Sequence, residues 1–308
     1  MTDSVLVIGA GGFIGRALCT HLSRGARPIQ ALVRRQPDDP VPGVHYITGG
    51  LESAPELDSL LGECACIVYA ASSSTPGSSA GKPVDEVDRH LRPLGVLLEK
   101  LQTNTHAHLI YLSSAGATYG SSSERPFTEA DLLRPASYHG ATKVAAEMLI
   151  TAWANQFGGS ASIFRPSNVY GPGQQARAGF GIIPAALLAL KHSEPLEIWG
   201  DGSATRDYLY IDDLVTLLAK AIDDGGSPGT HTYNASSGEN VSVKQLLERI
   251  STTAGRPIDL QFTPARAVDA SEVRFDSAKA RRQFDWQPQY DLATGLKATW
   301  EWISKSAG

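Results

Sequence analysis

Short apolar runs alternate with amphipathic stretches through the first half of the chain. The apolar residues of the intervening stretches recur at helical spacing, as in FIGRALCTHLSR (13–24) and VDEVDRHLRPLGVLLEKL (84–101). The runs predicted to be strands are 4–10, 29–33, 44–48, 66–71, 108–114 and 161–167. Such alternation predicts βαβ units, and therefore an α/β fold with a doubly wound, Rossmann-like parallel sheet and helices on both faces.

The pattern becomes less regular after the GPG sequence at 171–173. We therefore predict two domains. Residues 1–170 form the sheet domain, and residues 171–308 mainly form a smaller α/β lobe, with some segments returning to the first domain. The sequence SVKQ (242–245) has the form of a capping box and predicts the start of a helix.

Composition excludes several classes of protein. The chain has 308 residues, 42% of them hydrophobic and 19% charged, with a net charge of −5 and scattered basic residues. This balance argues against nucleic-acid binding, and no apolar run reaches the ~20 residues of a membrane helix. The N-terminal apolar run is short and broken by glycines, so we expect no signal peptide.

Cysteine and histidine usage adds two expectations. Three cysteines without a pairing framework suit a reducing compartment, so we expect a cytoplasmic protein. The run CACIVYAA (64–71) is best explained as a buried strand rather than a reactive thiol pair. The histidines show no metal-binding spacing, and no metal is expected.

A glycine-rich turn follows the first predicted strand. Gly9, Gly12 and Gly15 form a GxxGxxG pattern, and Phe13 and Ile14 begin the next predicted helix. Glycine permits a tight turn and a close approach of the backbone to a pyrophosphate, which the helix N-terminus attracts. In this βαβ context the pattern predicts dinucleotide binding, although a purely structural turn is the alternative.

The second predicted strand ends without the acidic residue that would bind the adenosine ribose of NAD. Arg34 and Arg35 stand there instead and can pair with a 2′-phosphate. We therefore expect NAD(P), with NADP favoured over NAD. The alternative is that both arginines are solvated surface charges. Gly50 stands where many relatives of this fold carry an aspartate that contacts adenine.

Over nearly its whole length the chain resembles the extended short-chain dehydrogenases/reductases, in particular the NAD-dependent epimerase/dehydratase group typified by UDP-galactose 4-epimerases. The matching motifs are GAGGFIG (9–15), SSAGATYG (113–120), YHGATKVAAE (138–147), FRPSNVYGPG (164–173), GDGSATRDYLYIDDL (200–214) and YNASSGENVSV (233–243). Further cofactor contacts implied by the resemblance are Leu51, Ala70, Ala71, Ser72, Lys143 and Pro166.

The same resemblance implies a nucleotide-diphosphate sugar, a UDP- or dTDP-hexose, as substrate. Asn168 and Arg206 match family residues that hold the diphosphate and its ribose, as do Arg266 and Asp269. Trp199 lies where the family holds the base, although simple packing explains it equally well. A surface ion pair is the alternative for Arg206.

Family chemistry uses a tyrosine as acid/base, a lysine four residues later and a serine or threonine. In a helix with ~100° per residue, His139 lies ~40° from Lys143, whereas Tyr138 lies ~140° away. Histidine thus occupies the tyrosine position. Three alternatives remain: His139 transfers the proton, a π-bulge brings Tyr138 round, or there is no proton catalysis.

The hydroxyl residue is displaced as well, because Ala115 stands at the usual position. Ser114 and Thr118 are the two candidates, and each can instead be a turn-forming hydroxyl.

The leading hypothesis is an NAD(P)-dependent nucleotide-sugar epimerase that acts by transient oxidation at the hexose C4. A nucleotide-linked 4-keto-deoxysugar reductase is the first alternative, and a catalytically silent relative that binds dinucleotide and nucleotide sugar is the second. A 4,6-dehydratase is disfavoured, because Gly116 and Ala117 replace its usual Asp-Glu pair. The resemblance also implies a homodimer formed by helices near 84–103 and 138–157.

Overall fold

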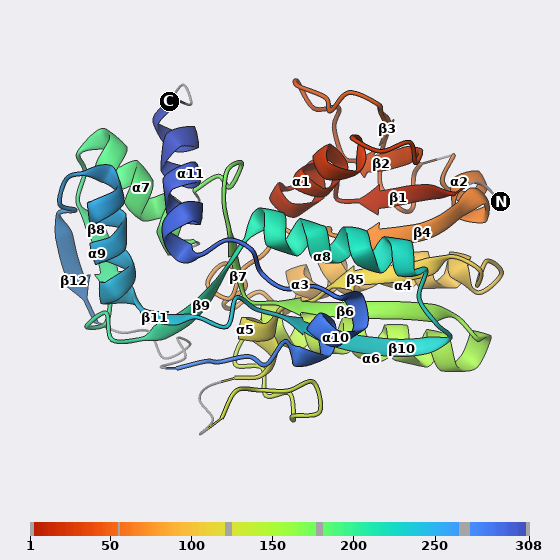
Figure 1. Cartoon of the computed structure of the whole chain (residues 1–308). Helices are drawn as coiled ribbons and strands as arrows, with labels where there is room; N and C mark the ends of the chain where they lie inside the picture. The colour runs from red at the N-terminus through yellow and green to blue at the C-terminus, as the bar shows by residue number, and fades with distance from the viewer. Residues whose placement is uncertain (1–2, 55, 121–124, 177–180, 265–271, 306–308) are drawn as a thin grey trace.

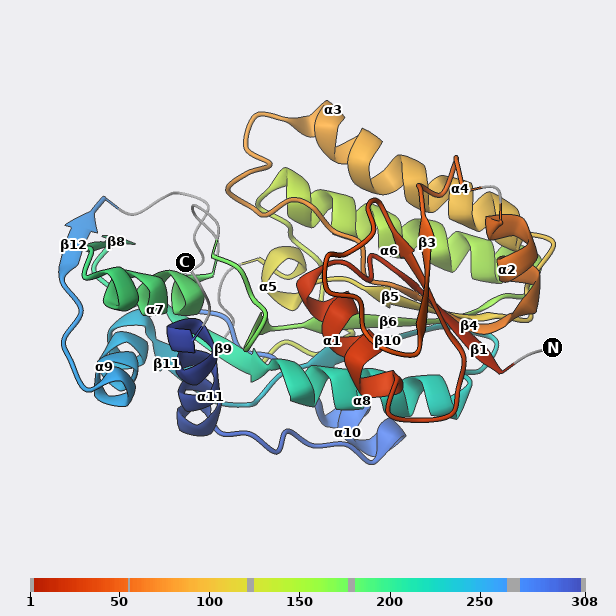
Figure 2. The same cartoon turned by 90° about the horizontal axis from the view of Figure 1, so that it is seen from above.

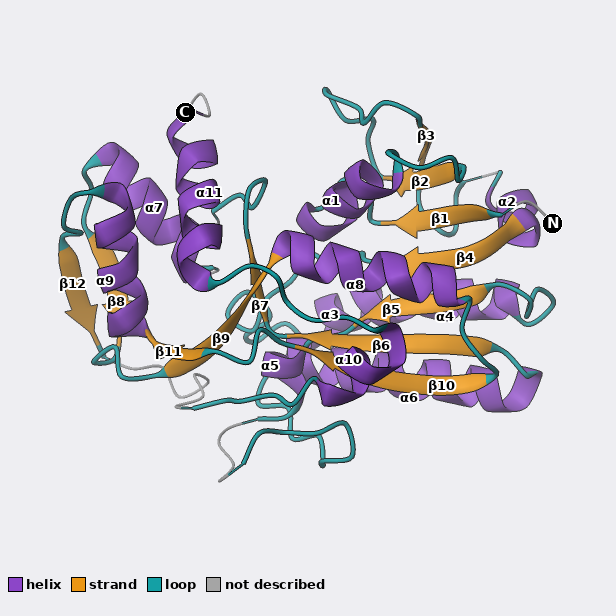
Figure 3. Ribbon diagram, viewed as in Figure 1, coloured by secondary structure: helices purple, strands orange, loops and turns teal. Residues whose placement is uncertain are grey.

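The computed structural model describes residues 3–54, 56–120, 125–176, 181–264 and 272–305. Within these ranges the chain forms a large sheet covered by helices and a smaller group of strands and helices beside it (Figure 1). Figure 3 shows that loops gather at the end of the large sheet that faces the smaller group.

In the described part of the chain the large sheet has seven strands in the order β10-β6-β5-β4-β1-β2-β3, all paired in parallel. The strands are β1 (Ser4–Ile8), β2 (Ile29–Val33), β3 (Val44–Thr48), β4 (Cys64–Tyr69), β5 (His108–Leu112), β6 (Ser160–Pro166) and β10 (Gly229–Ala235). The order reverses between β1 and β4, so their carboxyl ends flank the crevice where such sheets bind ligands. The predicted fold class is confirmed. All six predicted strands are present, whereas β10 was not predicted.

Two apolar layers cover the sheet because side chains alternate along its strands. Val5 and Val7 face one layer, while Leu6 and Ile8 face the other. The first layer contains helices α1 (Phe13–Leu22), α8 (Ile211–Asp224) and α10 (Ala278–Phe284). The second contains α2 (Leu57–Glu63), α4 (Arg92–Leu101) and α6 (Tyr138–Phe157). β10 and α8, although late in the sequence, therefore belong to the large sheet and its cover.

Before α4 the chain continues as one helical run through α3 (Pro83–Glu86) and a π-helical turn, η1 (Val87–Leu91). This run lies beside α6 (Figure 2). A short helix, α5 (Ala115–Thr118), follows β5 and packs on the first turn of α6.

Where the structure describes the smaller group, it holds two further sheets. β7 (Asn168–Tyr170) pairs in parallel with β9 (Thr205–Tyr210), which pairs antiparallel with β11 (Asn240–Ser242). The second sheet pairs β8 (Leu196–Trp199) with β12 (Leu260–Thr263). The helices of this group are α7 (Ile182–His192), α9 (Val243–Ala254) and α11 (Leu292–Lys305). The predicted capping box is confirmed, since Ser242 and Gln245 bond each other's backbone N–H groups at the start of α9.

Candidate active site

The glycine-rich turn is packed against the segment that follows β4. Gly9 has a φ of 88°, and a Cβ there would lie 2.6 Å from the backbone nitrogen of Ala71. A Cβ on Gly15 would clash with the carbonyl oxygen of Gly9. Glycine is therefore required at both positions, and the structure brings two predicted cofactor segments together between β1 and β4.

The start of α1 has the properties of an anion site. Gly12 is the N-cap and makes no side-chain capping bond, and the first helical turn contains no acidic residue. Gly11 and Gly12 are exposed, and Phe13 and Ile14 are half-buried. The first N–H groups of a helix have no intrahelical partner and carry a partial positive charge. This part of the chain fits a dinucleotide pyrophosphate.

The other predicted cofactor residues follow the same edge of the sheet. Arg34 and Arg35 come directly after β2, are exposed, and form no hydrogen bond or ion pair with another described residue. Leu51 follows β3 and is buried in the core. Two more segments are Ala70–Ser72 after β4, which becomes more exposed along its length, and Pro166, the buried last residue of β6.

α6 settles which side chain shares the face of the lysine. The helix begins at Tyr138 as a regular α-helix, with the Ser137 hydroxyl accepting from the backbone nitrogen of Gly140. His139 and Lys143 lie one turn apart and are only 8% and 7% exposed, whereas Tyr138 is 46% exposed. The π-bulge considered for Tyr138 is absent from this helix. The π-helical turn lies instead in the neighbouring helix, at η1.

Lys143 connects α6 to the end of β5. Its Nζ donates to the carbonyl oxygen of Leu112 at 2.7 Å and lies 5.0 Å from the centre of the Tyr111 ring. Burial lowers the pKa of Lys143 to about 8, against the opposing influence of Glu147 and Glu86. A cation at this strand end can donate to ribose hydroxyls of a cofactor lying across the edge of the sheet.

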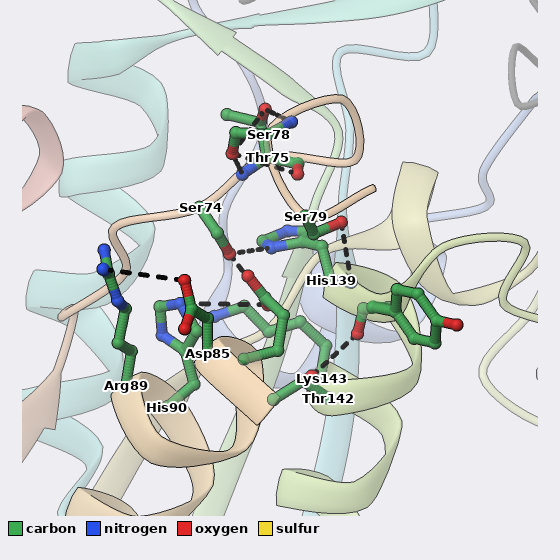
Figure 4. A network of polar contacts seen from close by, with 12 residues as sticks. Ser74, Thr75, Ser78, Ser79, Asp85, Arg89, His90, His139, Thr142 and Lys143 are labelled. Carbon is green, nitrogen blue, oxygen red and sulfur yellow. Dashed lines mark hydrogen bonds and ion pairs between the residues drawn. The ribbon is translucent and has the colours of Figure 1, made fainter. Parts of the chain in front are cut away.

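His139 is held by the loop that follows β4 (Figure 4). Its Nδ1 lies 2.9 Å from the hydroxyl of Ser74, and its backbone nitrogen donates to the hydroxyl of Ser79 at 3.2 Å. Burial lowers the pKa of His139 to about 3, and the charges of Lys143 and His90 contribute. The imidazole is therefore neutral near pH 7, so one ring nitrogen keeps its N–H and the other has a lone pair that can accept a proton.

The sequence reasoning missed Ser74, Ser79 and Glu86. The buried Glu86 carboxylate also accepts from Ser74, at 2.9 Å. Ser74 and Ser79 lie in the serine-rich segment 72–83, and nothing in its composition distinguishes these two serines from their neighbours. A signal did exist for Glu86, because it stands eight residues before the buried Leu94 on an amphipathic helix and so falls on the apolar face.

The two hydroxyl candidates occupy different environments. Ser114 is the half-buried N-cap residue of α5. Thr118 is fully buried, and its hydroxyl donates to the carbonyl oxygen of Ser114 at 2.7 Å. Thr118 therefore belongs to the packing of α5. A Cβ on Gly140 would clash with the carbonyl oxygen of Ala117, so glycine permits the close approach of α5 to α6.

The predicted substrate residues are only partly brought together. Asn168 on β7 donates from Nδ2 to the carbonyl oxygen of Asp207 at 2.9 Å and lies opposite Tyr208 of β9. Arg206 is two residues earlier on β9, half-buried, with Nη1 bonded to the carbonyl oxygen of Thr205. Trp199 ends β8 in the separate small sheet and is 37% exposed. Arg266 and Asp269 lie outside the described residues.

Two further observations concern chemistry and surroundings. Among the described residues, no group of three or more His, Cys, Asp or Glu side chains is placed to hold a metal ion. Over the same residues, we find no helix with the length and apolar character needed to cross a membrane.

Cys64 and Cys66 are buried in β4, which confirms the prediction of a buried strand.

The fold and this site define a Rossmann-like, dinucleotide-binding class of protein with a buried histidine–lysine pair at the cofactor edge. The model of the NAD dependent epimerase/dehydratase family matches residues 5–236. The chain belongs to this family, as the sequence motifs predicted.

Comparison with individual proteins agrees with this assignment. A UDP-glucose 4-epimerase of Mycolicibacterium smegmatis is 29% identical, and the match covers 97% of each chain. A dTDP-4-dehydro-6-deoxyglucose reductase of Escherichia coli is 27% identical over 96% of this chain and 95% of the relative. Among solved structures, MoeE5 in complex with UDP-glucuronic acid and NAD has a TM-score of 0.91 at 28% identity, covering 99% of this chain and all of the other.

Proposed function

We propose that this protein is an NAD(P)-dependent nucleotide-sugar epimerase that inverts the hexose C4 through transient oxidation. The observation that carries the proposal is the buried pair His139 and Lys143, one helical turn apart, at the edge where the glycine-rich turn opens. The two relatives named above act on UDP- and dTDP-linked sugars, as their names state.

Each part of the site has a role in this reaction. NAD(P), when bound, supplies a hydride acceptor at C4 and returns the hydride, so no outside oxidant is required. The start of α1 holds the pyrophosphate, and Lys143 holds the ribose of the nicotinamide. Nε2 of His139 accepts the proton of the C4 hydroxyl and gives it back. Asn168 and Arg206 bind the substrate diphosphate, for which a guanidinium offers paired donors.

A nucleotide-linked 4-keto-deoxysugar reductase is the second candidate. Arg34 and Arg35 favour it, because two exposed cations after β2 suit the 2′-phosphate of NADP, and we infer NADP as the preferred cofactor on the same ground. The neutral state of His139 argues against a reductase. That reaction must deliver a proton to the ketone oxygen, and a histidine whose pKa is about 3 is not in its acidic imidazolium form near pH 7.

The test incubates the purified protein with UDP- and dTDP-hexoses and identifies the nucleotides that copurify with it. Interconversion of C4 epimers without net cofactor consumption is the expected result. Stoichiometric loss of NADPH with a 4-keto sugar would assign the reductase instead. Tight binding of both ligands without turnover would overturn both enzymes in favour of a silent binding protein. Copurified NAD without NADP would contradict the cofactor preference.

We also infer a homodimer. The outer face of α6 exposes Met148 and Leu149, 67% and 43% respectively, between the small residues Ala145 and Ala152. On the adjoining helical run Val84 is 70% exposed. Packing this face against the same face of a second copy of the chain would remove these apolar side chains from water.

A further inference from the structure

A chain of hydrogen bonds connects His139 to a buried carboxylate on a different element. Ser74 lies in the loop after β4, and its hydroxyl points toward the ring of His139 (Figure 4). The same hydroxyl lies 2.9 Å from Oε2 of Glu86, the last residue of α3. Glu86 is 3% exposed. The segment from β4 to α3 thus brings both partners to the first turn of α6.

The chemistry of the three groups fixes the direction of the bonds. An ionised carboxylate only accepts hydrogen bonds, and a serine hydroxyl has one proton. Ser74 therefore donates to Glu86, and Nδ1 of His139 must carry the proton that it donates to Ser74. The lone pair is then on Nε2, which has no hydrogen-bond partner among the described residues. Glu86 thereby selects the tautomer whose free nitrogen is a base.

The hydrogen-bonded chain Glu86–Ser74–His139, called the relay below, lies among several other charged and titratable groups. Lys143 approaches from α6, and His90 of η1 has its Nε2 3.9 Å from Oε2 of Glu86. Burial lowers the pKa of His90 to about 4, so this second histidine is neutral near pH 7. Asp85, next to Glu86, is exposed and pairs with Arg89 on the outside of the helix. The charge of Lys143 also interacts with that of Glu86. A proton added to His139 is therefore linked to the Glu86 carboxylate through a single hydroxyl.

We propose that Ser74 and Glu86 are positioning residues that hold His139 as the Nδ1–H tautomer and stabilise its imidazolium during catalysis. The inference rests on the proposed function for the transfer step alone. In that step the O–H bond of the C4 hydroxyl breaks and an N–H bond forms at Nε2. With NAD(P) bound, the hydride of C4 would pass to the cofactor and leave a ketone at C4 of the sugar. After the ketone turns its opposite face to the cofactor, the hydride would return to C4 and Nε2 would give its proton back to the oxygen. The C4 epimer then forms with no net loss of protons or electrons.

The relay also accounts for a histidine where related enzymes use tyrosine. A tyrosine needs its pKa lowered by ~3 units to act as a base near pH 7. A histidine is already neutral near pH 7, but burial lowers the pKa of His139 to about 3, so the ring needs a partner that stabilises its protonated form. It also has two nitrogens, and one of them must be committed. The Ser79 hydroxyl holds the backbone of the same residue, so one loop orients both its main chain and its ring.

The first experiment reads the tautomer directly and does not depend on turnover. Histidine-selective ¹⁵N NMR is recorded on the full-length protein near pH 7, and the His139 signals are those lost in His139→Gln. A protonated Nδ1 and an unprotonated Nε2 are expected in the wild type. Glu86→Gln and Ser74→Ala are expected to shift the tautomer population, while Asp85→Asn, which removes a neighbouring exposed charge, leaves it unchanged. A protonated Nε2 in the wild type would overturn the proposal.

The second experiment measures epimerisation of the substrate that the wild type turns over. Glu86→Gln and Ser74→Ala are expected to lower kcat by about 10- to 100-fold with KM nearly unchanged. Ser74→Thr, which keeps the hydroxyl, should restore most of kcat. Wild-type kcat in both Glu86→Gln and Ser74→Ala would overturn the proposal. A wild type without turnover that still shows the Nδ1–H tautomer would support the positioning role and remove only the proposed reaction.

Discussion

At the scale of single residues, the site depends on which of two neighbours faces the lysine. Helical periodicity alone places His139, and not Tyr138, on the face of Lys143. The structure adds that His139 is buried and bonded at Nδ1, while Tyr138 is half in solvent. The two residues therefore make opposite predictions when each is changed.

Replacing His139 with Gln removes the base but keeps a polar side chain next to Ser74. We expect kcat for epimerisation to fall by ~10²–10⁴-fold, the usual contribution of a general base. Tyr138→Phe is the matched control and should leave kcat close to the wild-type value, because its hydroxyl lies outside the cluster. Steady-state kinetics on both variants measure the two values of kcat. A large loss of kcat in Tyr138→Phe with little loss in His139→Gln would make Tyr138 the general base instead.

At the scale of elements, the helices next to the site also form its outer wall. The run α3–η1–α4 and the helix α6 pack side by side, with the relay at their N-terminal ends and an apolar strip on the outer face of α6 (Figure 2). The π-helical turn lies between Glu86 and α4. It was not predicted, because a uniform helical period was assumed along this run, and a π-helical turn departs from that period by one residue.

The apolar strip formed by the exposed residues Met148 and Leu149 allows the proposed homodimer to be tested. Two carboxylates introduced by Met148→Glu with Leu149→Glu would be unpaired in the interface and should weaken association by ~100-fold or more. Light scattering after size exclusion is expected to give a dimer mass for the wild type and half that mass for the variant. Phe262→Glu, at a 52% exposed apolar residue on β12, is the control. A monomeric wild type would refute the homodimer.

At the scale of the whole molecule, three histidines are kept neutral by burial. The pKa of His139 is lowered to about 3, and those of His90 and His108 to about 4. Burial is the main cause in each case. In the unfolded chain a histidine has a pKa of ~6.5. Between these values the unfolded state binds protons that the folded state does not. The free energy of unfolding contributed by these groups therefore rises with pH across that window and is lost as pH falls from ~6.5 toward ~4.

His108 allows this dependence to be measured away from the site. It begins β5, is 2% exposed and bonds the hydroxyls of Ser160 and Ser162. His108→Gln should destabilise the protein at pH 7, but the difference from the wild type should shrink by roughly 2 kcal/mol at pH 5. Urea unfolding at both pH values gives the two differences.

His106, an exposed histidine two residues before His108, provides the control for the unfolding experiment. His106→Gln should follow the wild type at both pH values, because His106 is solvated in both states. Buried Asp207 and Asp213, whose pKa values burial raises, act in the opposite direction but equally in all variants. A constant difference between His108→Gln and the wild type would contradict the proposed cause.

The sequence by itself determined the parallel sheet, the glycine turn, the family and the face shared by His139 and Lys143. Each of these follows from local periodicity or from residues close together in the chain. It did not reveal β10, whose place beside β6 depends on pairing across more than 60 residues. Nor did it reveal Ser74 and Glu86, because a polar residue shows its partner only after the chain folds. Helical spacing could at most have placed Glu86 on a buried face, and only the tertiary structure joined it to Ser74 and His139, in a site where an unpaired polar group would be costly.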